Sequence, residues 1–236
     1  MNKTVKFFLS AGIVLTLVAA YFWFRRPQFL GNSGRDVQVL RWIRGGGNVP
    51  EWSIEANTRC GDALFQMPTT GFIGYLWGDS FRPGHRHQGI DIFGVPTVGV
   101  TPVYAAYDGY LSRQTDWKST VVIRIPNDPL QPSRQIWTYY THLADANGNS
   151  IIAADFPPGT SEVPVKAGAL LGYQGNYSGT PGKPVGVHLH FSIVLDDGSG
   201  QLRNELDIAN TLDPSPYFNL SLNASTNPGE VSLCAE

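Results

Sequence analysis

The chain has 236 residues, enough for one sizeable domain with extensions or for two small domains. Its 17 Lys and Arg nearly balance 19 Asp and Glu, so the charge gives no sign of a nucleic-acid partner. With 26 Gly, 17 Pro, 12% aromatic and only 15% charged residues, the composition favours a mainly β fold of short strands and turns over long exposed helices.

The N-terminus contains an apolar segment, Phe7–Phe24, that carries no charge. Such a helix nearly spans the roughly 30 Å hydrocarbon core of a bilayer. Bulky aromatic residues and the following Arg25 and Arg26 favour a retained anchor over a signal peptide cleaved near Ala20. Because the preceding tail is very short, we expect it to stay inside. Residues 1–26 then form a single-pass transmembrane anchor in the cell membrane, with the remaining chain extracytoplasmic, or secreted if residues 1–20 are cleaved.

The remaining chain divides into three parts by composition. Residues 27–61 are mixed and Gly-containing and are interpreted as a linker or stem with one strand or short helix near Val37–Ile43. Residues 62–218 are predicted to form the folded domain, and residues 219–236 a polar tail. Short β-type runs in the domain are predicted at 64–68, 71–77, 89–92, 102–106, 109–111, 120–125, 136–141, 169–172 and 187–195.

The two cysteines, Cys60 and Cys234, lie near the two ends of the apparent globular part. In an oxidising compartment they can form a disulfide that closes a very long loop, and the export signal favours this over two unrelated buried thiols.

All five histidines fall in three short segments: His85 and His87, His142, and His188 and His190. Residues two apart on a strand share a face, so His188 and His190 are expected to point the same way. Asp91 stands four positions after His87, which also puts both on one face of a strand. Two imidazoles and a carboxylate suit Zn²⁺, and three protein ligands plus water are typical of a catalytic zinc site.

Each pair taken alone is also compatible with ordinary surface pairs or hydrogen-bonded core pairs. The restriction of histidine to these segments makes the metal site the better interpretation. His85 is the main confounder, because on an extended segment it can share a face with His87. Its charged, loop-like context favours a rim residue.

Three ordered motifs, 87–92, 140–143 and 188–191, resemble the signatures of the M23 metallopeptidases, which include the lysostaphin and LytM-like peptidoglycan endopeptidases. Connecting segments resemble the same family. They are residues 78–82, 101–105 with Gly109, 165–168, 171–175 and 212–217. The resemblance covers roughly residues 62–218. It implies a compact antiparallel β-sheet domain with a groove lined by loops.

The resemblance also implies a role for each motif residue. His87, Asp91 and His190 correspond to the zinc ligands of the family, and His142 and His188 to its catalytic histidines. Glu usually follows His-Leu-His-Phe in this family, whereas Ser192 stands here. The loops 127–134, 144–162 and 176–187 look long and are expected to rim the groove.

The chemistry implied is hydrolysis of peptide bonds in peptidoglycan stems or cross-bridges by a zinc-activated water. The sequence lacks the His-Glu-x-x-His motif that supplies a glutamate base, so His142 and His188 are the candidates for handling protons. Two alternatives stand beside this zinc endopeptidase. One is a non-catalytic M23-like module that binds the cell wall or activates a cell-wall enzyme, although such relatives usually lose ligands. The other is a zinc peptidase acting on a protein.

Overall fold

The computed structural model describes residues 33–79, 84–222 and 230–234. The predicted membrane segment, residues 1–26, lies outside them. Within the described ranges, no helix combines the length and the apolar character needed to cross a membrane.

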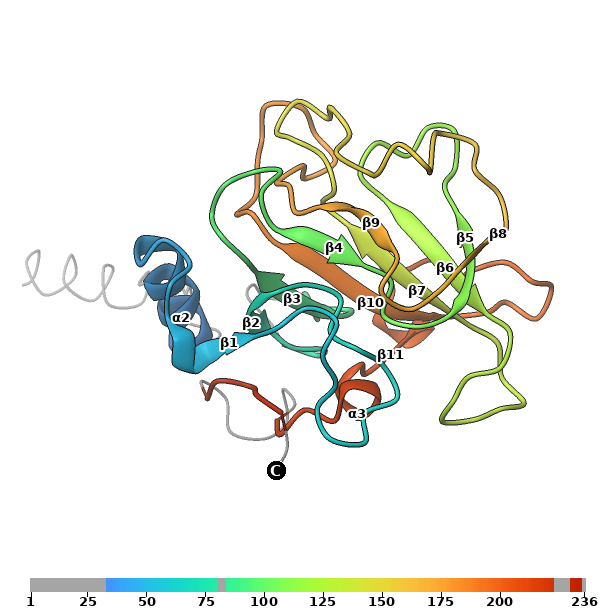
Figure 1. Ribbon diagram of the computed structural model, residues 1–236, viewed down its shortest axis with the longest axis horizontal. Helices are drawn as coiled ribbons and strands as arrows, with labels where there is room; N and C mark the ends of the chain where they lie inside the picture. The colour runs from blue at the N-terminus through green and yellow to red at the C-terminus, as the bar shows by residue number, and fades with distance from the viewer. Residues whose placement is uncertain (1–32, 80–83, 223–229, 235–236) are drawn as a thin grey trace, which may run out of the picture.

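The molecule is built on an antiparallel sheet of nine strands (Figure 1). Its path runs β1-β2-β3-β10-β7-β6-β5-β8, and β11 pairs with β10 beside this path. The strands are β1 (Ser53–Ile54), β2 (Gly71–Tyr75), β3 (Ile90–Phe93), β5 (Gly109–Ser112), β6 (Val121–Ile125), β7 (Ile136–Thr141), β8 (Val163–Val165), β10 (Leu189–Leu195) and β11 (Thr211–Leu212). A second sheet pairs β4 (Pro102–Tyr104) with β9 (Leu170–Tyr173). The mainly β prediction is therefore confirmed.

Side-chain alternation gives the large sheet two different faces. On β10, Leu189, Phe191 and Ile193 join the main hydrophobic cluster, which also contains residues of β4 and β9. His190 alternates with them and therefore lies on the opposite face. Its register partners are Asp91 on β3 and Thr141 on β7. One face of the sheet thus forms the core, and the other carries the candidate site.

Helix α2 (Ser33–Arg44) packs against β2, near the β1 end of the sheet (Figure 1). Its Val39 and Trp42 form a cluster with Phe72 and Phe93, and the Trp42 indole donates to the Gly94 carbonyl at 2.8 Å. The predicted stem therefore begins, within the described residues, with a helix packed on the sheet. The domain boundaries themselves stay predictions.

A buried ion pair adds to this attachment. Arg35 Nε lies 2.9 Å from an oxygen of Asp79, and both side chains are almost fully excluded from solvent. Removing one partner of such a pair leaves an uncompensated buried charge, so the pair helps to fix α2 in a single position.

Most predicted β-type runs contain a strand, and the run at 136–141 matches β7 in full. The prediction at 64–68 is wrong. The amides of Phe65 and Met67 donate to Tyr217 and Thr58, which are not neighbours in one ladder, and Pro68 has no N–H to donate. Three strands, β1, β8 and β11, were not predicted; they have two, three and two residues.

The predicted disulfide between Cys60 and Cys234 is confirmed, with 174 residues of sequence separation. Near it, Leu220 forms an antiparallel bridge with Cys234. The end of the chain is thereby attached beside α3 (Ser215–Phe218).

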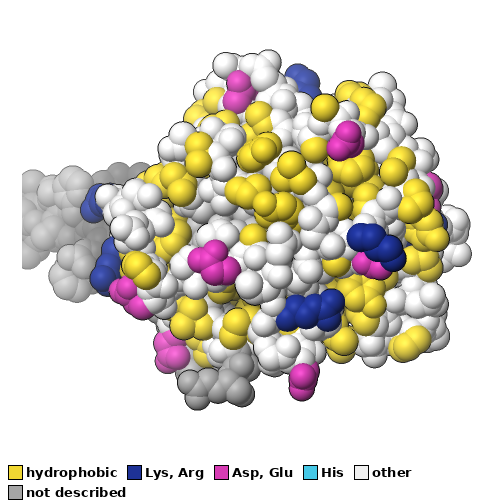
Figure 2. Space-filling model, viewed as in Figure 1, with side chains coloured by type: hydrophobic (Ala, Val, Ile, Leu, Met, Phe, Trp, Pro, Cys, Tyr) yellow, Lys and Arg dark blue, Asp and Glu magenta, His cyan; other side chains and the backbone are white. Residues whose placement is uncertain are grey.

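Figure 2 shows one face of the molecule, on which acidic and basic side chains lie singly or in small groups of opposite sign. Among the described residues, no extended basic patch gathers on this face. The distribution agrees with the small net charge of −2.

Candidate metal centre

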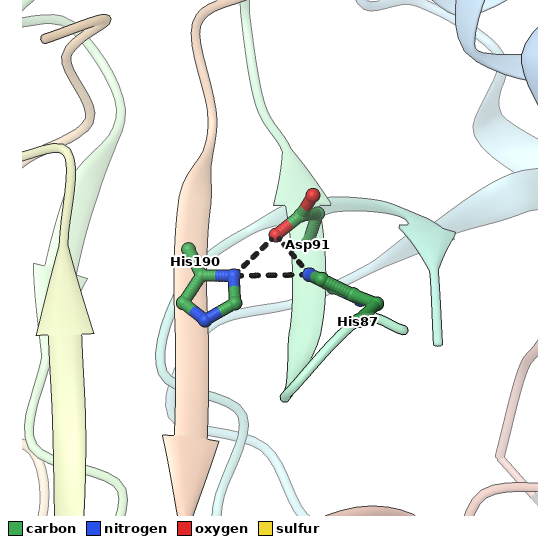
Figure 3. Close-up of side chains that lie close together, drawn as sticks. All are labelled: His87, Asp91 and His190. Atoms are coloured by element: carbon green, nitrogen blue, oxygen red, sulfur yellow. Dashed lines mark hydrogen bonds and ion pairs between the residues drawn. The ribbon is translucent and has the colours of Figure 1, made fainter. Parts of the chain in front are cut away.

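Three side chains meet on the site face of the sheet: His87, Asp91 and His190 (Figure 3). His87 Nε2 lies 3.0 Å from Asp91 Oδ1 and 3.0 Å from His190 Nδ1. His190 Nδ1 lies 2.8 Å from Asp91 Oδ1. All three residues are buried. The structure therefore brings together the residues that the sequence predicts as metal ligands.

The register of β3 and β10 explains this meeting, because Asp91 and His190 are directly opposite each other. Gly89 makes the close approach possible. A Cβ at this position would lie 2.1 Å from the Phe191 carbonyl oxygen, nearer than any real contact. The glycine between His87 and Asp91 is thus required by the packing of β3 against β10.

Hydrogen bonds fix which ring nitrogen of each histidine faces its neighbours. His87 Nδ1–H donates to the Leu76 carbonyl at 3.1 Å, and His190 Nε2–H donates to Glu205 Oε1 at 2.9 Å. The opposite nitrogens, His87 Nε2 and His190 Nδ1, therefore point toward Asp91. In metal sites the second ring nitrogen of a histidine ligand usually makes this kind of bond.

The donor set fits a zinc ion. Ligands at about 2.0–2.2 Å from a tetrahedral zinc lie about 3.3 Å from one another, so small outward movements of these atoms would make room for the ion. Two imidazole nitrogens and one carboxylate oxygen leave a fourth position open for water or substrate, as in catalytic zinc sites.

In the metal-free cluster, the ionisable groups lie so close together that they shift one another's pKa values. Burial alone would raise the pKa of Asp91, but the surrounding histidines His87, His188 and His190 hold it well below its usual range. Burial alone would lower the pKa of His190, but its bonds to Asp91 and Glu205 raise it to about 10. A metal ion must therefore displace a proton from His190 on binding.

The two predicted catalytic histidines lie beside this cluster. Their ring centroids are 4.5 Å apart, and His188 Nε2 is 3.6 Å from Asp91 Oδ1. His142 Nδ1–H donates to the Tyr177 carbonyl at 2.6 Å, and His188 Nδ1–H donates to the Gly186 carbonyl at 2.7 Å. These carbonyls accept only, so Nε2 of each neutral ring is left as the proton acceptor.

Burial also keeps both of these rings neutral. It lowers the pKa of His142 to about 3, with help from the neighbouring His188 and His190. Burial likewise lowers the pKa of His188. Both imidazoles are thus available at neutral pH as bases or hydrogen-bonding groups.

The backbone of His142 is unusual, because its φ of 70° lies in the left-handed region. A non-glycine residue held there costs about 1–3 kcal/mol, and such residues cluster at functional sites. This conformation, at the end of β7, accompanies the hydrogen bond of its ring to Tyr177.

A groove of ≈ 590 Å³ contains the cluster. Val39 and Ile43 of α2 form part of its wall, and His85, the predicted rim residue, also lines it. A second groove, of ≈ 820 Å³, is lined by Val122, Trp137 and neighbouring loops. Register places both of these residues on the same sheet face as His190.

The long loops differ in what they line. Part of the loop 176–187 lines the metal-centre groove, as predicted, whereas residues 159–162 line the second groove. The prediction for the loop 127–134 is wrong, because neither groove includes it. Its Asp128 is buried, accepts from the Tyr217 hydroxyl at 2.9 Å and pairs with Arg134. These bonds hold the loop against α3.

Glu205 and Ser192 complete the cluster, and no role was predicted for either side chain from the sequence. Ser192 Oγ donates to Glu205 Oε1 at 2.7 Å, the same oxygen that His190 contacts. Ser192 stands where the resembling family usually has Glu, and here a carboxylate reaches this neighbourhood from a later loop. No motif marks Glu205, because it lies in a polar stretch without strand periodicity.

Comparisons with known proteins give related solved structures. No protein-family model matches the chain, and no curated protein is significantly similar to it. A protein assigned as the glycyl-glycine endopeptidase LytM from Ruminococcus gnavus is 28% identical over 55% of this chain and 44% of its own, with a TM-score of 0.36. The chain therefore spans less than half of that protein.

Two further structures are similar at lower identity. Lysostaphin is 22% identical over 62% of this chain and 49% of its own, with a TM-score of 0.39. A mutant catalytic domain of the prophage-encoded M23 protein EnpA from Enterococcus faecalis is 22% identical over 64% of this chain and 94% of its own, with a TM-score of 0.34. The solved structures that this chain resembles are thus peptidases of the M23 family.

Proposed function

We propose that this chain is a zinc-dependent endopeptidase of the M23 type that hydrolyses peptide bonds in peptidoglycan stems or cross-bridges. One observation carries the proposal. His87, Asp91 and His190 bring three ligand atoms within 3.0 Å of one another, and His142 and His188 lie directly beside them in a groove. The complete set supports an enzyme over a non-catalytic module.

The roles proposed for the five residues follow from their hydrogen-bonding geometry. His87, Asp91 and His190 would hold the zinc ion, which when bound would supply Lewis-acid chemistry for activating water and polarising the scissile carbonyl. His142 and His188 keep Nδ1–H on backbone carbonyls, so their Nε2 atoms can take a proton from water or, once protonated, donate to the oxyanion. The groove that contains these rings is the proposed binding place of the peptide.

Two features support peptidoglycan as the proposed substrate: the ordered motifs and the proposed location of the domain outside the cytoplasm. We place the folded domain outside the cytoplasm, attached by residues 1–26 or released by their cleavage. The Cys60–Cys234 disulfide supports this, since such bonds persist in oxidising compartments. Protease added to spheroplasts, whose outer layers have been removed, should degrade the domain; protection until the cytoplasmic membrane is opened would contradict this location.

The test is digestion of purified peptidoglycan by the zinc-loaded protein, with and without a chelator, and identification of the products by mass. We expect new peptide termini that disappear with chelator and return with added zinc. A denatured protein serves as a parallel substrate. Cleavage of the protein alone would replace peptidoglycan as the substrate class, and no cleavage of either would overturn the enzymatic proposal.

A further inference from the structure

Glu205 lies in the loop between β10 and β11 and is 9% exposed. Its Oε1 accepts two hydrogen bonds, one from His190 Nε2–H at 2.9 Å and one from Ser192 Oγ–H at 2.7 Å. Both donors are on the site face of β10, two residues apart. The carboxylate therefore sits against the side of the His190 ring that points away from Asp91.

The loop that carries Glu205 is itself held in place. The Asn204 carboxamide oxygen accepts from the Leu206 amide at 3.2 Å, and the Asn204 carbonyl accepts from the Asn210 side chain at 3.0 Å. The Gln88 side chain, next to His87, donates to the Leu206 carbonyl at 2.9 Å. These bonds tie the loop to the segment of the first predicted ligand and fix the position of the carboxylate.

We infer that Glu205 is a positioning residue for the metal centre: it holds the imidazole of His190 in the orientation and tautomer that direct Nδ1 to the metal. This inference rests on the proposed zinc site. A carboxylate that accepts from a ligand histidine fixes the ring and makes its other nitrogen a stronger donor. Ser192 in turn orients the carboxylate, because its hydroxyl shares the same oxygen.

The geometry separates this role from two others. Glu205 is not placed as a fourth ligand, since its contact is with Nε2 of His190 and the ligand atoms meet at Nδ1. It is also not placed as the reacting base. Its Oε1 accepts from two donors on β10. His188 Nε2 instead lies 3.6 Å from Asp91 Oδ1, the oxygen that His190 Nδ1 contacts.

The test is the zinc affinity of the full chain, measured by competition with a chromophoric chelator. Glu205→Gln keeps the shape but removes the charge, and we expect about 10–100-fold weaker zinc binding. Ser192→Ala leaves the carboxylate and should weaken binding less. Glu162→Gln is the matched control, because it neutralises an exposed carboxylate paired with Arg124 and should bind zinc like the wild type.

A second readout distinguishes positioning from other roles. At saturating zinc, Glu205→Gln should recover most of its peptidase turnover. Turnover that remains lost at saturating zinc would make Glu205 a reacting group and overturn the inference. Wild-type zinc affinity in Glu205→Gln would also overturn it.

Two other results of these experiments would have a different meaning. A wild-type chain that binds no zinc would refute the zinc site of the proposed function rather than the role of Glu205 within it. If Glu205→Gln does not fold, Glu205→Asp carries the test, since its shorter side chain withdraws the carboxylate from His190. Unchanged zinc affinity in folded Glu205→Asp and Ser192→Ala together would contradict the positioning role.

Discussion

The two faces of β10 show how one short strand serves both stability and chemistry. Leu189, Phe191 and Ile193 are fully buried in the main cluster, where they contribute through packing. His190 and Ser192 alternate with them and contribute through hydrogen bonds to Asp91 and Glu205. The apolar face makes the strand rigid, and this rigidity keeps polar side chains on the other face within 3 Å of their partners.

The largest expected effect is a loss of turnover, from a substitution on the site face. His188→Ala should retain zinc, because this residue is not among the three ligands, but should lose about 10²–10⁴-fold in turnover. Zinc content and steady-state rate with a peptide substrate check this. A variant that cleaves at the wild-type rate would remove His188 from the catalytic pair.

The next largest effect is a loss of stability, from substitutions on the face of β10 that forms the core. Phe191 packs edge-on against Tyr140 and Phe218, so Phe191→Ala should lower the free energy of unfolding by about 3–5 kcal/mol. Ile193→Val, a smaller truncation in the same strand, should cost about 0.5–1.5 kcal/mol. Urea unfolding of both variants measures the difference. Equal costs would show that the two positions are not packed as described.

The disulfide lies away from the site face, and its Cys60 belongs to the main hydrophobic cluster. Replacing Cys60 and Cys234 together by serine should cost about 2–4 kcal/mol, mainly by releasing a constraint on the unfolded chain. Zinc affinity should be unchanged, because neither cysteine contacts the site. Thermal unfolding and chelator competition on one sample measure both quantities, and a coupled loss of zinc would contradict this separation.

The contrast between the faces also explains what the sequence predicted. Period-two alternation in 187–195 predicted that His188 and His190 share a face, and both rings lie beside Asp91. The longer strands were likewise predicted from local sequence patterns. Local patterns carried this information.

The features that were missed depend on contacts between distant segments. Glu205 reaches His190 from a loop without periodicity, and Val39 reaches the groove from a helix that precedes the predicted domain. The run at 64–68 reads as a strand, but tertiary contacts with Thr58 and Tyr217 take its amides. Local propensity cannot show where such partners lie.

The most direct test of the metal centre is the zinc content of the purified chain and of His190→Ala, measured by elemental analysis after dialysis. We expect about one zinc per wild-type chain, and neither zinc nor peptidase activity in the variant, because two remaining ligands do not hold a catalytic zinc. His190→Ala that folds and still binds a full equivalent of zinc would contradict the assignment of His87, Asp91 and His190.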